Sequence, residues 1–217
     1  MMNAKEIDET LDALKRKDAK KLIEIAGMNA EEFNIEDPTR EDVDRVLKAI
    51  MSKIEQGDYE YFSSKVNDVE YLSEYLDLLS YSTKIEDIKE VLDKRKELRI
   101  SLRNLRKLII ATKEPWYIKE FLEDKEKIKE FRHSSYDFRK LILATNDFEY
   151  IQNIIKDETL RENRYELYGG ELIELILETN NDEYIKQIIE DKEFRTDKLN
   201  LQPYHVAKLI IGTKQPG

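Results

Sequence analysis

The feature that most limits how this chain can fold is a threonine that recurs at a nearly constant interval. Each copy follows a similar apolar run, and the interval is 33, 34 and 34 residues between Thr112, Thr145, Thr179 and Thr213. A period of this length is typical of architectures in which one supersecondary unit is stacked many times. The fold of one repeat therefore largely sets the fold of the region.

Each repeat predicts two short helices separated by a polar bend. Before the threonine, apolar residues follow the i, i+3, i+4 spacing of a helix face, as in Phe138, Leu141 and Ile142. After the bend a second apolar stripe follows, formed here by Ile151, Ile154 and Ile155. Since the chain is 39% charged and has only 6 Gly and 4 Pro, both helices are expected to carry polar outer faces.

The bend is a boundary between two helices because proline stands where the second helix should begin. Pro115 occupies the expected first turn, where a missing N–H is tolerated, and Pro216 takes the same place in the fourth copy. One such repeat cannot bury its own apolar face, whereas stacked neighbours can. The sequence thus predicts an all-α protein, an α-solenoid of stacked two-helix repeats.

The N-terminal region differs from the repeats. Residues 1–60 show no clear period and predict amphipathic helices, one ending at Gly27 and one beginning with a capping box at Thr39 and Asp42. We interpret 1–60 as an irregular helical N-terminal cap or a small helical domain, and 61–217 as repeats that begin with a degenerate copy. The fourth copy stops at the bend, so we expect a truncated last repeat and a longer parent protein.

The repeats resemble the ankyrin family in their 33–34-residue period, their two short helices and their sizeable connector. The run ILATNDFEYIQNII, from Ile142, is similar to the ankyrin stretch that joins an Ala-containing first helix to the second helix. The Thr-Pro-Leu-His opening of that family is missing, which argues against its β-hairpin fingers. Tetratricopeptide repeats share the period and rank second. The ankyrin resemblance implies protein–protein recognition without a catalytic residue.

Several chemistries find no support in the sequence. There is no cysteine, no phosphate-binding loop and no nucleophile motif, and His133 and His205 lie far apart without a metal-ligand pattern. We expect no catalytic residue, cofactor or metal ion. The net charge of -10 makes general nucleic-acid binding an unfavoured reading. The apolar runs are too short to span a bilayer and no signal peptide is visible, so no membrane partner and a cytoplasmic location are expected.

Two aromatic residues are candidate contacts for a partner. Trp116 has Glu149 and Glu183 at the equivalent positions of the next repeats, which predicts that it faces solvent and can anchor an interface. Packing against the irregular upstream region is the alternative for Trp116. Tyr117 belongs to a tyrosine that recurs before the first isoleucine of each second helix, a position more typical of packing between repeats.

A basic segment is the other candidate. Residues 94–107 contain seven Lys or Arg and one Glu, and we expect them to form a basic helix that contacts an acidic partner or phosphate, or simply a solvated helix face. The cations proposed as contacts are Lys94, Arg95, Arg99, Arg103 and Arg106.

These observations favour a non-enzymatic protein–protein interaction scaffold. Two alternatives stay open. In the first alternative, the chain is the recruiting or targeting region of a larger modular enzyme or secreted effector. In the second, it binds nucleic acid through the basic helix 94–107. The sequence does not predict the partner or the oligomeric state.

Overall fold

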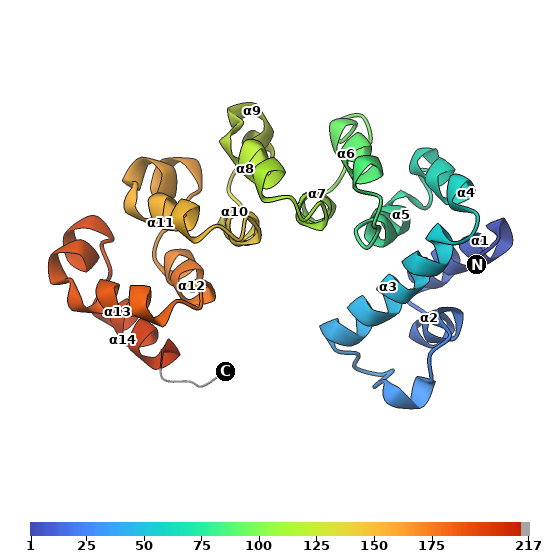
Figure 1. Ribbon diagram of the computed structural model, residues 1–217, viewed down its shortest axis with the longest axis horizontal. Coiled ribbons are helices and arrows are strands. Elements are labelled where there is room, and N and C mark those ends of the chain that lie inside the picture. The colour runs from blue at the N-terminus through green and yellow to red at the C-terminus, as the bar shows by residue number, and fades with distance from the viewer. Residues whose placement is uncertain (214–217) are drawn as a thin grey trace. The chain divides into compact units, whose positions relative to one another are not determined.

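The computed structural model describes residues 1–213, and within that range every regular element is a helix (Figure 1). The chain divides into two compact parts, residues 1–112 and residues 113 onward. The first part holds α1 (Ala4–Arg16), α2 (Ala19–Ala26), α3 (Arg40–Glu55), α4 (Tyr59–Ser64), α5 (Leu72–Leu79), α6 (Ile85–Asp93) and α7 (Leu102–Ala111). The second holds α8 (Pro115–Glu123), α9 (Lys125–Ile128), α10 (Ser135–Ala144), α11 (Phe148–Lys156), α12 (Gly170–Glu178), α13 (Asp182–Glu190) and α14 (Pro203–Gly212).

In the C-terminal part, the first helix of each repeat packs against the first helix of the next. The first helix α10 contacts the next first helix, α12, and α12 in turn contacts α14. Helix α10 also contacts α8, the second helix of the preceding repeat. The apolar positions predicted for this packing are buried, with Leu141, Ile142, Leu175 and Ile176 fully inaccessible. In the N-terminal part, α3 packs on α2 and α5, and α5 packs on α7.

The bend between the two helices of a repeat has a recurring backbone geometry. The residue after the threonine adopts the left-handed conformation, with φ of 53° at Lys113, 48° at Asn146 and 51° at Asn180. The threonine hydroxyl donates to a carbonyl in the last turn of the first helix, as from Thr145 Oγ1 to Ile142 O at 2.6 Å. In two of these bends the next side chain caps the second helix: Asp147 accepts from Tyr150 N and Asn181 accepts from Tyr184 N, each at 3.0 Å. The predicted boundary is confirmed, and Pro115 opens α8 as expected. Pro216 lies outside the described residues.

The connectors fold as short helical turns, and no strand occurs in residues 1–213. An aspartate after each second helix caps the turn, and Asp157 accepts from Leu160 N at 3.0 Å. Asp157 therefore caps the connector turn that follows α11. The connector turns include η3 (Lys129–Phe131), η4 (Thr159–Arg164) and η5 (Phe194–Lys198).

Arg161, in η4, links two successive connectors. Its side chain is almost fully buried, at 1% exposure, and donates to Ile155 O at 2.8 Å and to Lys198 O at 3.0 Å. The first bond satisfies a carbonyl at the end of α11 and the second reaches the neighbouring connector. Because removing a buried donor strands its acceptors, this residue is important for the register between repeats.

The N-terminal part contains a bend of the same kind, although residues 1–60 show no clear period. Lys17 has a φ of 55°, and Asp18 caps α2 by accepting from Lys21 N at 3.0 Å, as Asn146 and Asp147 do in their repeat. The stretch DYEYF, from Asp58, also matches DFEYI, from Asp147. The capping box at Thr39 and the helix end at Gly27 are confirmed. The division at residue 60 stays a prediction.

Tyrosine–carboxylate hydrogen bonds join helices in the N-terminal part. Four tyrosine hydroxyls each donate to an aspartate of another helix at 2.5–2.7 Å: Tyr59 to Asp87, Tyr61 to Asp8, Tyr71 to Asp12 and Tyr81 to Asp44. Burial, followed by the bond to Asp87, raises the pKa of Tyr59 well above its usual range. Several aspartates of this acidic chain therefore serve as hydrogen-bond acceptors within the fold.

The left-handed bend can be tested at Asn146, which is exposed. We expect Asn146→Val to lower the free energy of unfolding by about 1–2 kcal/mol, because a β-branched side chain is strained at positive φ. Asn146→Gly, which carries no such strain, is expected to stay within about 0.5 kcal/mol of the wild type. Urea denaturation followed by circular dichroism measures both, and an equal loss for the two variants would contradict the role of the bend.

Candidate partner-binding surface

Trp116 is a large aromatic side chain exposed at the start of a helix. Pro115 begins α8 and sets Trp116 in its first turn, where the side chain is 58% exposed and its ring lies edge-on to Tyr117, with centroids 5.8 Å apart. The equivalent residues Glu149 and Glu183 are exposed too. The prediction that Trp116 faces solvent is confirmed.

The recurring tyrosines lie deeper than Trp116. Tyr117 and Tyr150 are half-buried and Tyr184 is buried, with its ring edge-on to Phe148 at 5.4 Å. Burial raises the pKa of Tyr184 to about 12. Lys119 lies over the Tyr150 ring and pairs with Asp147. This arrangement agrees with packing between repeats. A role of Tyr117 in partner binding remains a prediction.

The basic segment 94–107 is not one helix, so the expectation of a continuous basic helix is wrong. Helix α6 ends at Asp93, and a turn follows in which Arg99 has a φ of 53°. Ser101 then caps α7 by accepting from Asn104 N at 3.3 Å. A left-handed residue and a new N-cap interrupt any helix, which explains the difference.

The side chains of this segment are unequally available. Lys94, Arg99 and Arg103 are exposed, and Lys94 pairs with Glu90 at 2.6 Å. Arg95 and Arg106 are half-buried, and Arg95 donates to Leu92 O at 3.2 Å. Three of the five predicted contacts thus face solvent, all in the N-terminal part.

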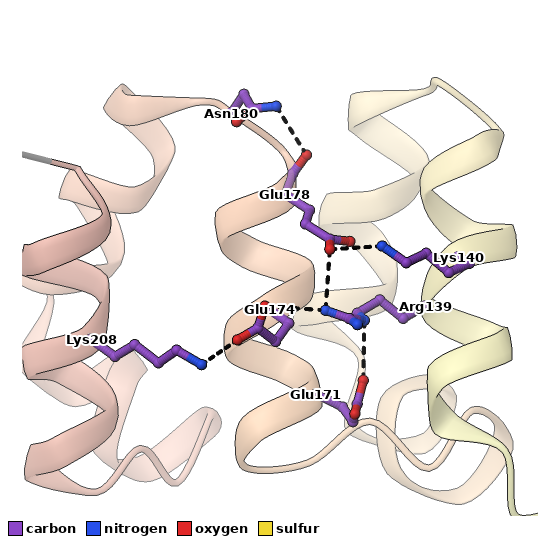
Figure 2. Close-up of polar contacts among 7 residues, drawn as sticks. All are labelled: Arg139, Lys140, Glu171, Glu174, Glu178, Asn180 and Lys208. Carbon is purple, nitrogen blue, oxygen red and sulfur yellow. Dashed lines mark hydrogen bonds and ion pairs between the residues drawn. The ribbon is translucent and has the colours of Figure 1, made fainter. Parts of the chain in front are cut away.

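A network of ion pairs ties α10, α12 and α14 together in the C-terminal part (Figure 2). Arg139 is buried, with 6% exposure, and its guanidinium faces three glutamates of α12: Glu171 at 3.1 Å, Glu174 at 3.3 Å and Glu178 at 3.3 Å. Lys140 also pairs with Glu178, at 2.8 Å, and Lys208 of α14 pairs with Glu174. Three cations and three carboxylates balance one another, so the network positions helices and leaves no net charge for a ligand.

Sequence reasoning missed this network, although a signal for it exists. The glutamates of α12 follow i, i+3 and i+7 spacing, which places them on one helix face. Five residues before the recurring threonine stand Lys107, Lys140, Glu174 and Lys208, so the charge at this position changes sign from α10 to α12 and again from α12 to α14. Equivalent positions on adjacent helices of a stack are neighbours, which makes such alternation a sign of ion pairs.

The two histidines are in unlike surroundings. His133 is exposed, with Nδ1 3.4 Å from Glu166, whereas His205 is buried and its Nδ1 accepts from Gln202 N at 3.2 Å. Burial lowers the pKa of His205 and favours its neutral form. Within residues 1–213 no group of three or more His, Asp or Glu side chains is arranged to hold a metal ion.

No helix in the described part of the chain is both long and apolar enough to cross a membrane. Comparisons with protein-family models, curated proteins and solved structures find no match to this chain. What is shown is a protein of many helices whose organisation is consistent with helical repeats.

The ion-pair network makes stability depend on pH. The ammonium of Lys208, with Arg139 acting in the same direction, holds the pKa of Glu174 below its ordinary value of 4.5. A carboxyl group with a depressed pKa in the folded state stabilises the fold above its unfolded pKa, and this contribution is lost as pH falls through the folded pKa.

We therefore expect Glu174→Gln to lower the free energy of unfolding at pH 7 by about 0.5–1 kcal/mol, a modest value because the pair is partly exposed. The difference from the wild type should shrink as pH falls through the lowered pKa of Glu174. Glu183→Gln, at an exposed position of α13, is the matched control and should have little effect at any pH. Denaturant titrations at pH 7 and pH 3 measure this, and a difference that persists at pH 3 would refute the electrostatic origin.

Proposed function

We propose that this protein is a non-enzymatic protein–protein interaction scaffold. In this proposal the two-helix repeats stack as a degenerate ankyrin-like α-solenoid, and residues 1–60 form its N-terminal cap. The side-by-side packing of α10, α12 and α14, with a recurring bend in each repeat, supports the stacked arrangement. Stacks of this kind offer an extended surface built from side chains that the repeat itself does not need.

The observation that carries the proposal is the exposure of Trp116. A repeat position that holds glutamate in two neighbours holds the single tryptophan of the chain in this one, with 58% of its side chain in water. Tryptophan is among the residues that contribute most to interfaces, since it buries a large apolar area and can also donate a hydrogen bond. An aromatic side chain exposed to this extent is best explained by a partner that covers it.

The basic segment 94–107 would contribute to the same protein–protein recognition by attracting an acidic partner. Lys94, Arg99 and Arg103 project from the turn before α7 and from its first turn, in a chain with a net charge of -10. Such a local positive patch favours approach of an acidic partner and adds mainly to the association rate. Nucleic-acid binding through this patch is less favoured, because the rest of the chain repels phosphate. A recruiting role within a larger enzyme or effector would use the same surface.

The proposal is tested by affinity capture from native lysate with the wild-type chain and Trp116→Ala as baits, followed by mass spectrometry. We expect a specific partner whose affinity falls at least about tenfold in the variant, since interface hot spots contribute about 2 kcal/mol or more. Tyr168→Ala is the matched control, because Tyr168 is also aromatic and 56% exposed. Equal retention by folded Trp116→Ala and wild type would overturn the role of Trp116.

A further inference from the structure

A cavity of about 400 Å³ lies between two successive connectors of the C-terminal part. Four cations line it, Lys125, Lys129 and Arg132 from one connector and Arg164 from the next, together with one carboxylate, Glu166. The lining thus has a net charge of +3 in a chain whose net charge is -10. We call this cavity the connector cleft.

Most of this positive charge is not neutralised within the fold. Lys129 pairs with Glu126 at 2.6 Å, but among residues 1–213 no carboxylate forms an ion pair with Lys125, Arg132 or Arg164. Lys125 and Arg132 are exposed and Arg164 is half-buried. Cations that converge on one cleft with few ion-pair partners repel one another, and an anion bound between them relieves that repulsion.

The cleft also breaks the regularity of the repeats. Counted from the recurring threonine, the position of Arg132 is held by Tyr165 and Leu199 in the next two connectors, and both of those side chains are buried. The position of Lys125 is held by Glu158 in the next connector and by Lys192 in the one after it. The charge at Arg132 therefore does not follow from the architecture of a repeat, just as the tryptophan at position 116 does not.

The remaining lining indicates what kind of anion fits. Phe138 and Leu160 supply apolar surface between the cations, and Thr159 and Asn163 supply hydrogen-bonding groups. A peptide that alternates acidic and apolar side chains uses all of these groups. A free phosphate would leave the apolar surface unused, and the acidic body of the chain disfavours a nucleic-acid backbone. A cavity of this volume is in the range of known ligand sites.

We propose that the connector cleft binds an acidic peptide segment of a partner protein, one that carries an apolar residue between carboxylates. This inference rests on the proposed scaffold function and assigns the chemistry of its partner. Carboxylates bind Lys125, Arg132 and Arg164, and the apolar side chain packs on Phe138 and Leu160.

The test uses the full chain and a fluorescein-labelled eight-residue peptide of alternating glutamate and leucine, with fluorescence anisotropy as the readout. The wild type is expected to bind this peptide and to bind it more weakly as salt is raised. A peptide with glutamine in place of glutamate should bind at least about tenfold more weakly. Inorganic phosphate and a single-stranded DNA oligonucleotide are added as competitors.

Charge reversal on the protein locates the site. The double variant Lys125→Glu/Arg132→Glu changes two exposed side chains, so its helical circular dichroism should match the wild type, while its affinity for the acidic peptide falls at least about tenfold. Lys156→Glu/Lys192→Glu makes the same charge change at exposed positions outside the cleft and should alter the affinity less than about threefold.

Each contrary outcome points elsewhere. Equal losses in the two double variants, or no binding of the acidic peptide by the wild type at low salt, would overturn the connector cleft as its site. Displacement of the peptide by phosphate or DNA at lower concentration than by unlabelled peptide would assign the cleft to those anions instead. A partner that is lost with Trp116→Ala but retained by the Lys125→Glu/Arg132→Glu variant would refute this inference and leave the scaffold function standing.

Discussion

The left-handed backbone conformation at a few fixed positions is the constraint on which the repeats depend. Two short helices can pack against each other only if the chain reverses within a few residues, and a single residue at positive φ provides that reversal. Non-glycine residues hold this conformation at the bends between helices and in the connectors, and a further one lies in the N-terminal region. They are Lys17, Arg99, Lys113, His133, Asn146, Glu166, Asn180 and Asn200. Each carries some strain, which the packed helices on either side must outweigh.

The threonine that reveals the repeat in the sequence is part of the same device. Its hydroxyl returns to the first helix, as from Thr179 Oγ1 to Ile176 O at 2.6 Å, and its oxygen lies 3.4 Å from the backbone nitrogen of Asn181, the residue that caps the second helix. A small hydroxyl side chain is needed there because both groups lie close by. This explains why the most regular residue of the sequence stands at the bend and not in the apolar core, where several side chains are interchangeable.

The sequence predicts the helices better than the contacts between them. Helix ends at Gly27, Thr39 and Pro115 are set by local capping chemistry and could be predicted. The helical turns of the connectors have no amphipathic period, so their structure could not be predicted from the sequence. The pairing of Arg139 with the glutamates of α12 depends on the register between helices some 35 residues apart, which one sequence does not specify.

For the candidate site, the departure of one repeat from the others was the useful signal. This signal correctly predicts that Trp116 lies at the surface, and the same signal is present in the connectors, where Arg132 departs from the buried Tyr165 and Leu199. The continuous basic run 94–107 was misleading, because neighbours in sequence are divided there between a turn and a helix.

The two sides of the C-terminal stack are held by groups of different chemistry. On one side, ion pairs join the first helices, among them those of Glu174, whose pKa Lys208 lowers, whereas on the other side the buried Arg161 donates to two backbone carbonyls and pairs with Glu162. Protonation of Glu174 thus weakens the contacts between the first helices, while the bonds from Arg161 to backbone carbonyls have acceptors that do not titrate. The repeats would then separate first where α10, α12 and α14 face one another, while the connectors remain linked through Arg161.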